Sequence, residues 1–287
     1  MYSEFDLDLP DSLDDAMAMM ANGKGEDPTP LAGGTNLIVD IRAKRENPSH
    51  VVSLNNVTEL RRVEIDDKQV VVGGRTTVSD LLRHEEFELA APSLAQSARV
   101  FGGQIVRNAA TIAGNIGSGS PAADLVPPLL SLDAKLTLAS HTGTREVPLD
   151  EFYLDYKKNV RRPDELITRI FWPRPVNAVN TFYKLARRKG DAITITGVAI
   201  TLAVENRACS RARIALGAVA PVVLRARKAE AMLEGEALTP ALIEAAAKQA
   251  VNECEPIDDV RASAEYRRHT VHALTRRLVT QAWDRLT

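Results

Sequence analysis

The sequence is poor in cysteine. Its two cysteines, Cys209 and Cys254, lie far apart in the chain, whereas an iron–sulfur cluster held by one chain needs four ligands of this kind. The histidines include His269 and His272 on one expected helix, but neither His-Glu-x-x-His nor Glu-x-x-His accompanies them. We therefore expect buried or neutral thiols, a solvated helix face that carries both histidines, and no metal site.

Long apolar runs and an excess of one charge are also missing. The apolar stretch over residues 124–132 is short and interrupted by prolines, while a membrane helix needs roughly 20 apolar residues. A net charge of −2 provides no basic field for a phosphate backbone. The first residues carry acids where a secretory signal has a basic segment and an apolar core. We expect a cytoplasmic protein with no membrane span and no nucleic-acid partner.

Standard nucleotide and nucleophile motifs are absent too. The Gly-x-Gly-x-x-Gly of Rossmann folds and the Gly-x-x-x-x-Gly-Lys-Ser/Thr of P-loops do not occur. No catalytic triad, paired-carboxylate site or catalytic cysteine is recognisable. A phosphate-containing ligand would therefore need a different loop architecture.

The first half of the sequence alternates short strand-like and helical patterns. Apolar residues make up 45% of the chain and charged residues 26%, as in an ordinary globular protein. From the spacing of apolar residues and the turn signals, we expect strands at 29–32, 51–54 and 70–72, and helices at 11–20, 37–41 and from Thr77 onward.

After Pro173-Arg-Pro175 the pattern changes to a run of strands followed by a run of helices. We expect antiparallel strands at 181–186, 195–204 and 214–219, then helices at 226–233, 240–254 and 264–283. Leu274, Leu278 and Ala282 mark a buried stripe on the last helix. This order predicts an α+β fold, with a first domain over residues 1–175 and a smaller second domain over 176–287.

Glycine is frequent between residues 90 and 133, at positions 102, 103, 114, 117 and 119. A flexible linker would be polar throughout, but Phe101, Ile112 and Ile116 are interleaved with these glycines. Glycine loses the most backbone entropy on folding. The pattern therefore indicates an ordered loop whose backbone lies close to a ligand.

The first candidate binding segment is Pro30-Leu-Ala-Gly-Gly-Thr-Asn36, which leads into an apolar helix. Successive backbone N–H groups in a glycine turn before a helix form a concave anion site. Thr35 and Asn36 can add side-chain hydrogen bonds to phosphate oxygens. A plain strand–turn–helix connection is the alternative interpretation.

The second candidate segment runs from Phe101 to Asp124. In it Thr111 and Asn115 offer side-chain hydrogen bonds, and Gly114 lets the backbone lie against a flat ring. Asp124 precedes an apolar stretch, where it can either cap a helix or hold a ribose hydroxyl.

Three motifs together resemble those of a known family: Ala-Gly-Gly-Thr-Asn (32–36), Thr-Ile-Ala-Gly-Asn-Ile (111–116) and Ser-Pro-Ala-Ala-Asp (120–124). They are similar to the FAD loops of the medium, flavin-binding subunits of the xanthine dehydrogenase and carbon monoxide dehydrogenase family of molybdenum hydroxylases. Phe-Tyr-Lys-Leu-Ala-Arg-Arg (182–188) and the segment 256–268 extend the resemblance over essentially the whole chain.

The resemblance implies a vanillyl-alcohol-oxidase (PCMH)-type FAD-binding domain in two α/β subdomains, about 1–55 and 56–175. A smaller domain of antiparallel strands and helices would follow. It also implies a non-covalent FAD site. The residues that would hold the cofactor are Ala32, Gly33, Gly34, Thr35 and Asn36 at the pyrophosphate, Phe101 near the flavin or adenine, Thr111, Ala113, Gly114 and Asn115 in the second loop, Asp124 at the adenosine side, Ile167 in the pocket wall, and Lys184 near the isoalloxazine or the phosphates.

The sequence departs from some relatives at two places. Residues 116–124 contain no cysteine, which excludes the extra iron–sulfur cluster that some relatives carry there. Thr35-Asn36 stands where carbon monoxide oxidisers tend to have His-Ser, which disfavours carbon monoxide as the substrate of the whole complex.

The function that the resemblance implies is electron transfer. A large molybdenum–pterin subunit would hydroxylate the substrate, a small subunit would carry two [2Fe–2S] clusters, and the FAD here would pass electrons to NAD, oxygen or another acceptor, in a dimer of heterotrimers. Lys184 would favour an anionic reduced flavin, or else belong with Arg187, Arg188 and Lys189 to a solvated basic turn. The alternatives are a free-standing flavoprotein oxidase of the same fold and a cofactor-free assembly protein.

Overall fold

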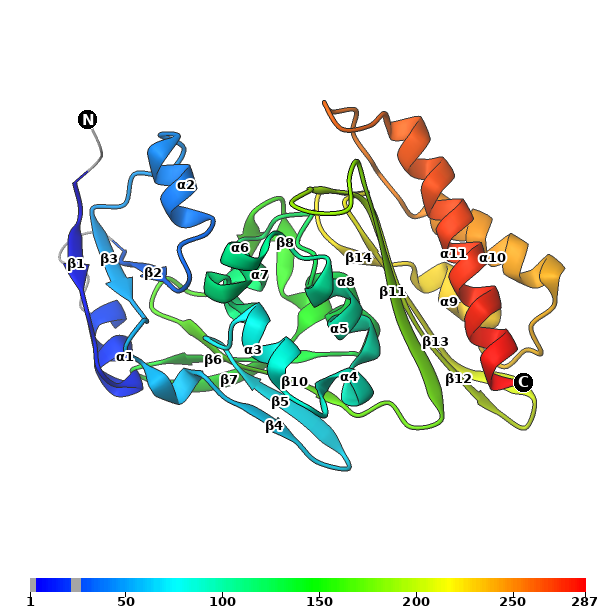
Figure 1. Cartoon of the computed structure of the whole chain (residues 1–287), viewed down its shortest axis with the longest axis horizontal. Coiled ribbons are helices and arrows are strands. Elements are labelled where there is room, and N and C mark those ends of the chain that lie inside the picture. The colour runs from blue at the N-terminus through cyan, green and yellow to red at the C-terminus, as the bar shows by residue number, and fades with distance from the viewer. Residues whose placement is uncertain (1–3, 22–26) are drawn as a thin grey trace.

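A computed structural model describes residues 4–21 and 27–287 (Figure 1). The first three residues of the expected N-terminal subdomain, and residues 22–26 within it, lie outside this described part. In this part, three larger sheets follow one another across the molecule, with helices between and around them, and a fourth sheet has two short strands. The α+β architecture expected from the order of elements is confirmed.

The N-terminal unit is a parallel sheet with strand order β1-β3-β2. Its elements are β1 (Asp6–Asp8), α1 (Leu13–Ala21), β2 (Thr29–Leu31), α2 (Leu37–Arg42) and β3 (His50–Ser53). Ser12 Oγ accepts a hydrogen bond of 3.1 Å from the Asp15 N–H and so caps α1. Each of these elements except β1 matches a strand or helix expected from the sequence.

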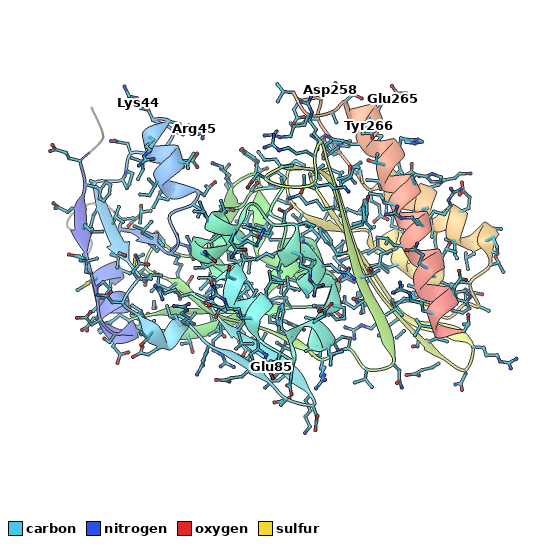
Figure 2. The ribbon with its side chains drawn as sticks, in the orientation of Figure 1. Lys44, Arg45, Glu85, Asp258, Glu265 and Tyr266 are labelled. Carbon is cyan, nitrogen blue, oxygen red and sulfur yellow. The ribbon has the colours of Figure 1, made fainter. Side chains whose placement is uncertain are left out.

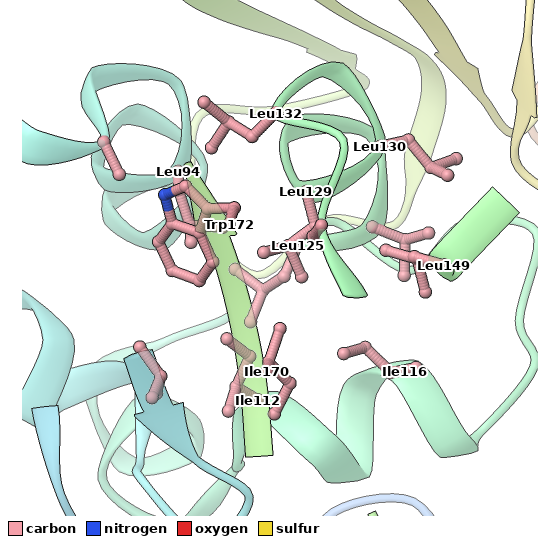
Figure 3. Close-up of a cluster of buried hydrophobic side chains, with 14 of the residues drawn as sticks. Leu94, Ile112, Ile116, Leu125, Leu129, Leu130, Leu132, Leu149, Ile170 and Trp172 are labelled. Carbon is pink, nitrogen blue, oxygen red and sulfur yellow. The ribbon is translucent and has the colours of Figure 1, made fainter. Parts of the chain in front are cut away.

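The middle unit is an antiparallel sheet with strand order β4-β5-β10-β6-β7. Its strands are β4 (Val63–Ile65), β5 (Gln69–Gly73), β6 (Lys135–Ser140), β7 (Gly143–Pro148) and β10 (Leu166–Pro173). β10 enters between two strands that precede it in the chain. Its Trp172 and Ile170 are fully buried among apolar side chains from the helices of this unit (Figure 3).

Short helices fill the region between β5 and β6. They are α3 (Val78–Arg83), α4 (Phe87–Ala90), α5 (Pro92–Arg99), α6 (Gln104–Ala109), α7 (Ile112–Gly117) and α8 (Val126–Ser131). The expectation of an ordered loop over 90–133 is therefore wrong for most of that stretch. A helix of six residues shows less than two turns of apolar periodicity, so glycines and prolines dominate the sequence pattern. Further short elements are η1 (Thr58–Leu60), η2 (Leu149–Glu151), β8 (Tyr153–Asp155) and β9 (Lys158–Asn159).

The C-terminal unit is an antiparallel sheet whose strands follow the order of the chain. Its elements are β11 (Ala178–Ala186), β12 (Thr194–Glu205), β13 (Ala208–Gly217), β14 (Leu224–Arg225), α9 (Arg227–Leu233), α10 (Pro240–Asn252) and α11 (Ala264–Leu286). The expected strands and helices are confirmed. Leu274, Leu278 and Ala282 are buried, as the stripe on the last helix predicts.

Both faces of this C-terminal sheet are covered. Along β12, Val198 and Ile200 face the core under α9, α10 and α11, whereas Ala199 between them belongs to the core of the middle unit. Two hydrogen bonds also join α5 to β11: Gln96 Oε1 accepts from the Phe182 N–H at 2.7 Å, and the Ser93 backbone N–H donates to Asn180 Oδ1 at 2.9 Å. The middle and C-terminal units therefore share a continuous buried interface.

The cysteines and histidines have ordinary structural surroundings. Both cysteines are free, and burial raises the pKa of Cys209 to about 11 and that of Cys254 to about 12, the direction expected for neutral thiols. His269 is exposed as expected. His272 is only half-buried, and its Nε2 lies 3.0 Å from Glu244 Oε1, so the expectation of a fully solvated face is wrong there. Within residues 4–21 and 27–287, no group of three or more potential ligands is arranged to hold a metal ion.

Candidate functional site

The fold brings the two glycine segments into contact, although about eighty residues separate them in the sequence. A Cβ atom at Gly33 would lie only 1.9 Å from the carbonyl oxygen of Ala109, at the end of α6. A Cβ atom at Gly114 would lie 3.9 Å from Cβ of Ala32. Since no side chain fits between Gly33 and Ala109, the first segment can approach the second this closely only with glycine at position 33.

The first segment presents backbone donors at its turn. Gly34 has a φ of +67°, a left-handed conformation that glycine adopts without strain. Thr35 and Asn36 are exposed. Across the described ranges, the backbone N–H groups of Gly33, Gly34 and Thr35 donate to no protein acceptor. These donors at the surface can bind an anion.

The side chains of the first segment differ in how they are held. Asn36 Nδ2 donates to Asp40 Oδ2 at 3.0 Å. Asp40 is itself buried and also pairs with Arg45 (labelled in Figure 2) at 2.8 Å and with Lys157 at 3.5 Å. Asn36 is therefore oriented by an ion-pair network, whereas Thr35 extends into solvent without a described partner.

The second segment offers an exposed glycine rather than free donors. At the start of α7, the N–H groups of Ile112 and Ala113 donate to the carbonyls of Thr76 and Gly74. Thr111 Oγ1 caps the helix by accepting from the Gly114 N–H at 3.1 Å. The first turn of α7 is thus satisfied by the protein. Gly114 is exposed, so a planar group can lie against its backbone.

Asn115 connects the second segment to the following one. Its Oδ1 accepts from the Leu125 N–H at 3.1 Å, so the hydrogen-bonding oxygen expected to face a ligand is used inside the protein. Phe101 is also mostly internal: 9% of it is exposed, and it belongs to the middle core. Both residues therefore make their described contacts within the fold.

Ile167 and Gly74 form a wall beside α7. A Cβ atom at Gly74 would lie 2.1 Å from the Ile167 carbonyl oxygen and 3.2 Å from Cβ of Ala113. Ile167 is 8% exposed, and the register of β10 against β6 shifts just after it. Gly74 was not among the site residues predicted from the sequence, although the pair Gly73-Gly74 after a strand is a signal of close backbone approach.

Asp124 does not cap a helix, so that interpretation is wrong. α8 begins at Val126 with Leu125 as its N-cap residue and has no side-chain cap. The Asp124 carboxylate instead accepts from Lys184 Nζ at 2.7 Å and from the Thr194 hydroxyl. Burial raises the pKa of Asp124, and the Lys184 ammonium and Thr194 hydroxyl oppose that rise.

Lys184 is likewise not part of a solvated turn. Only 4% of its side chain is exposed, and Nζ also donates to the Val100 carbonyl at 3.2 Å. Arg187, Arg188 and Lys189 are exposed, so the basic turn begins after it. Thr194 was missed by sequence reasoning because its partner lies 70 positions earlier.

These features together fit a large ligand with a diphosphate and a planar ring. The first segment supplies unpaired N–H donors, Gly114 supplies an exposed backbone without a side chain, and the second segment ends at the buried Asp124–Lys184 ion pair. No helix in the part of the chain that the structure describes has both the length and the apolar content of a membrane span.

Comparisons with known proteins show the family of this chain. The family described as the FAD binding domain in molybdopterin dehydrogenase matches residues 3–175, and the C-terminal domain of the CO dehydrogenase flavoprotein matches residues 181–282. The carbon monoxide dehydrogenase medium chain of Hydrogenophaga pseudoflava is 31% identical over 98% of both chains. The xanthine dehydrogenase FAD-binding subunit of Escherichia coli O157:H7 is 30% identical over 88% of this chain and 87% of that one.

Solved structures give the same result. Carbon monoxide dehydrogenase from Hydrogenophaga pseudoflava superposes with a TM-score of 0.94 at 31% identity over 99% of both chains. Quinoline 2-oxidoreductase from Pseudomonas putida superposes with a TM-score of 0.90 at 26% identity, over 100% of this chain and 99% of that one. The chain therefore belongs to the family of FAD-binding subunits of molybdenum hydroxylases, which are oxidoreductases.

Proposed function

We propose that this chain holds FAD non-covalently and passes electrons from the [2Fe–2S] clusters of a small partner subunit to an external acceptor such as NAD or oxygen. The substrate is hydroxylated on a large molybdopterin subunit, and the complex is a dimer of heterotrimers. The family match over both domains supports this assignment. FAD supplies the redox chemistry when bound, and the protein supplies binding, orientation and electrostatics.

The observation that carries the proposal is the contact between the two glycine segments. Gly33, Gly34 and Thr35 offer N–H donors for the pyrophosphate, with Ala32 and Asn36 flanking them. The remaining cofactor-binding residues in this proposal are Phe101, Thr111, Ala113, Gly114, Asn115, Asp124, Ile167 and Lys184. Of these, Gly114 is the one with an exposed backbone and no side chain, so we place the flat part of the cofactor against it.

Asp124 and Lys184 act on one part of the cofactor in this proposal. Their charged atoms are 2.7 Å apart, so they cannot serve the opposite ends of an extended dinucleotide. The resemblance alone assigned Asp124 to the adenosine side and left Lys184 near either the isoalloxazine or the phosphates. In this proposal both residues therefore face the same part of the cofactor.

The experiment that tests the proposal is the visible absorption spectrum of the purified chain, followed by release and identification of any cofactor. We expect a flavin spectrum without iron–sulfur bands and FAD in the released fraction. A colourless protein that takes up no added FAD would contradict the proposal. Turnover of an organic substrate by the isolated chain would instead support a free-standing flavoprotein oxidase.

Electron transfer is tested by mixing the FAD-loaded chain with a reduced [2Fe–2S] partner subunit under anaerobic conditions. Bleaching of the flavin band on mixing is expected. A flavin that stays oxidised beside a competent reduced partner would remove the electron-transfer role and leave FAD binding in place.

A further inference from the structure

The C-terminal segment 256–268 contains a buried arginine that the proposed FAD site does not use directly. Arg267 lies in the first turn of α11, and 4% of its side chain is exposed. A buried cation is costly unless it is paired and hydrogen-bonded. The contacts of Arg267 therefore indicate what this position does.

Asp259 provides the compensating charge. Arg267 Nη2 lies 2.9 Å from Asp259 Oδ1. Burial disfavours the charged carboxylate, but hydrogen bonds from the Arg261 and Ala262 N–H groups and from Arg267 hold the pKa of Asp259 well below its usual range. The loop before α11, in which Figure 2 labels Asp258, is thereby tied to the helix through a permanently charged pair.

The other end of the guanidinium contacts two strands of the sheet. Arg267 Nη1 donates to the Ile195 carbonyl at 2.7 Å and to the Ala218 carbonyl at 2.6 Å. Ile195 is the second residue of β12, and Ala218 follows the last residue of β13. Ala218 has a φ of +63°, a left-handed conformation that is unfavourable for alanine. A neighbouring group must therefore hold this residue in place.

Both strand positions lie next to a contact with residues 120–124. Thr194, which precedes Ile195, donates its hydroxyl to Asp124. The N–H of Ala218 donates to the Pro121 carbonyl at 2.8 Å. Arg267 thus hydrogen-bonds to the start of β12 and to the residue after β13. At both places the C-terminal domain hydrogen-bonds to the Ser120–Asp124 segment.

We propose that Arg267, with Asp259 as its counter-ion, is a positioning residue that orders the Ser120–Asp124 segment for FAD binding. This inference rests on the proposed function, in which Asp124 belongs to the FAD site. It assigns a role to a C-terminal motif that lies outside the FAD-binding domain. Within residues 4–21 and 27–287, the side-chain hydrogen bonds of Arg267 go to Asp259, Ile195 and Ala218, so it acts on Asp124 only through neighbouring residues.

The test compares Arg267→Ala and Arg267→Lys with the control Leu278→Ala in the full chain. Leu278 lies on the same helix, is 3% exposed and packs in the C-terminal core, so its truncation destabilises the helix packing without removing a hydrogen bond to Ile195 or Ala218. Circular dichroism selects a temperature at which all variants are folded. FAD is then titrated by quenching of its fluorescence.

We expect Arg267→Ala to raise the FAD dissociation constant at least tenfold, while Leu278→Ala changes it less than twofold. Arg267→Lys should lie between them, because an ammonium cannot bridge both carbonyls and the carboxylate as a planar guanidinium does. Equal affinities in the Arg267→Ala and Leu278→Ala proteins would overturn the inference. If Arg267→Ala does not fold, the FAD dissociation constants of Arg267→Lys and Asp259→Asn are compared with that of Leu278→Ala instead. Affinities equal to that of Leu278→Ala would again overturn the inference.

Hydrogen exchange of the cofactor-free chain provides a readout that does not depend on FAD. The amides of Ala122, Ala123 and Leu125 are hydrogen-bonded to Ser120 or Asn115. They should exchange faster in the Arg267→Ala protein than in the Leu278→Ala protein. Unchanged exchange would overturn the positioning role even if the wild-type chain binds FAD. A wild-type chain that does not bind FAD would overturn the proposed function, while the exchange data would still show whether Arg267 orders this segment.

Discussion

Lys184 and Asp124 form an ion pair of 2.7 Å across the junction of the two domains, with 4% and 11% of their side chains exposed. Lys184 comes from β11, and Asp124 precedes α8. The pair connects the C-terminal sheet to the segment after the second glycine motif. A change at either residue therefore affects both domain packing and the proposed FAD site.

Replacement of Lys184 by alanine should destabilise the chain and weaken FAD retention. Removing one partner of a buried pair leaves an uncompensated charge, which typically costs about 3–5 kcal/mol. Urea unfolding and the flavin-to-protein absorbance ratio measure the two effects, and we expect any retained flavin to have a lower reduction potential. Lys189→Ala at the exposed turn is the control. Unchanged flavin content and potential in Lys184→Ala would rule out its role at the cofactor.

Replacement of Gly33 by alanine should abolish the close contact between the two glycine segments. The added Cβ would lie 1.9 Å from a backbone oxygen, which cannot move as a flexible side chain does. We expect FAD affinity to fall by at least tenfold, measured by titration of the cofactor-free protein. Gly190→Ala, where nothing lies within 4 Å of the added atom, should bind FAD like the wild type. Similar affinities for both variants would show that the contact is unimportant for binding.

Glu165 should contribute to acid sensitivity. It is 1% exposed and bonded to Arg145 and Arg162. Burial alone would raise its pKa, but these arginines and the Arg162 N–H outweigh burial and lower the pKa from 4.5 to about 2. A depressed carboxyl pKa stabilises the fold above the unfolded pKa, and this stabilisation is lost as pH falls from about 4.5 towards 2.

The measurement for Glu165 is the free energy of unfolding in urea between pH 7 and pH 2.5, in the wild type and in Glu165→Gln. The variant should be less stable at pH 7 and show a shallower decline below pH 4.5. Glu151→Gln, at an exposed residue, should follow the wild-type curve. Parallel curves for wild type and Glu165→Gln would contradict the assigned role.

The two domains should unfold together. They share buried residues on the face of the C-terminal sheet that meets α5 and α8, and a large apolar interface couples folding units. The chain has two tryptophans: Trp172 in the middle core and Trp283 beside the C-terminal core. In the Trp172→Phe protein, the fluorescence of Trp283 reports the unfolding of the C-terminal domain. In the Trp283→Phe protein, the fluorescence of Trp172 reports the unfolding of the first domain. Coincident urea midpoints are expected, and midpoints that differ clearly would show independent domains.

Secondary structure with long, regular patterns was predictable from the sequence. Along β12, large apolar residues alternate with small residues from Val198 to Val204, and α11 repeats its buried stripe over several turns. The six-residue helices between residues 104 and 131 were not predictable, because each shows less than two turns and their stability comes from packing. The position of β10 between β5 and β6 also depends on pairing between segments far apart in the chain.

The candidate site was also predictable only in part: the positions of its glycine segments were, and the partners of its side chains were not. The two glycine segments were identified from their own residues, since a backbone approach as close as that of Gly33 to Ala109 requires glycine. Their roles in detail were less predictable. Asn115 and Asp124 looked like residues free to bind a ligand or cap a helix, yet their partners are Leu125, Lys184 and Thr194.

The sequence by itself determined where glycine removes a side chain and allows a left-handed backbone conformation. It also determined which family the chain resembles, because these properties belong to single residues and short motifs. Only the tertiary structure decided that Gly33 meets Ala109, that Asp124 meets Lys184, and that Arg267 reaches two strands. The physical reason is that a buried charge must be paired with a group from another segment of the chain. Tertiary packing decides which segment supplies that group, and the local sequence does not specify it.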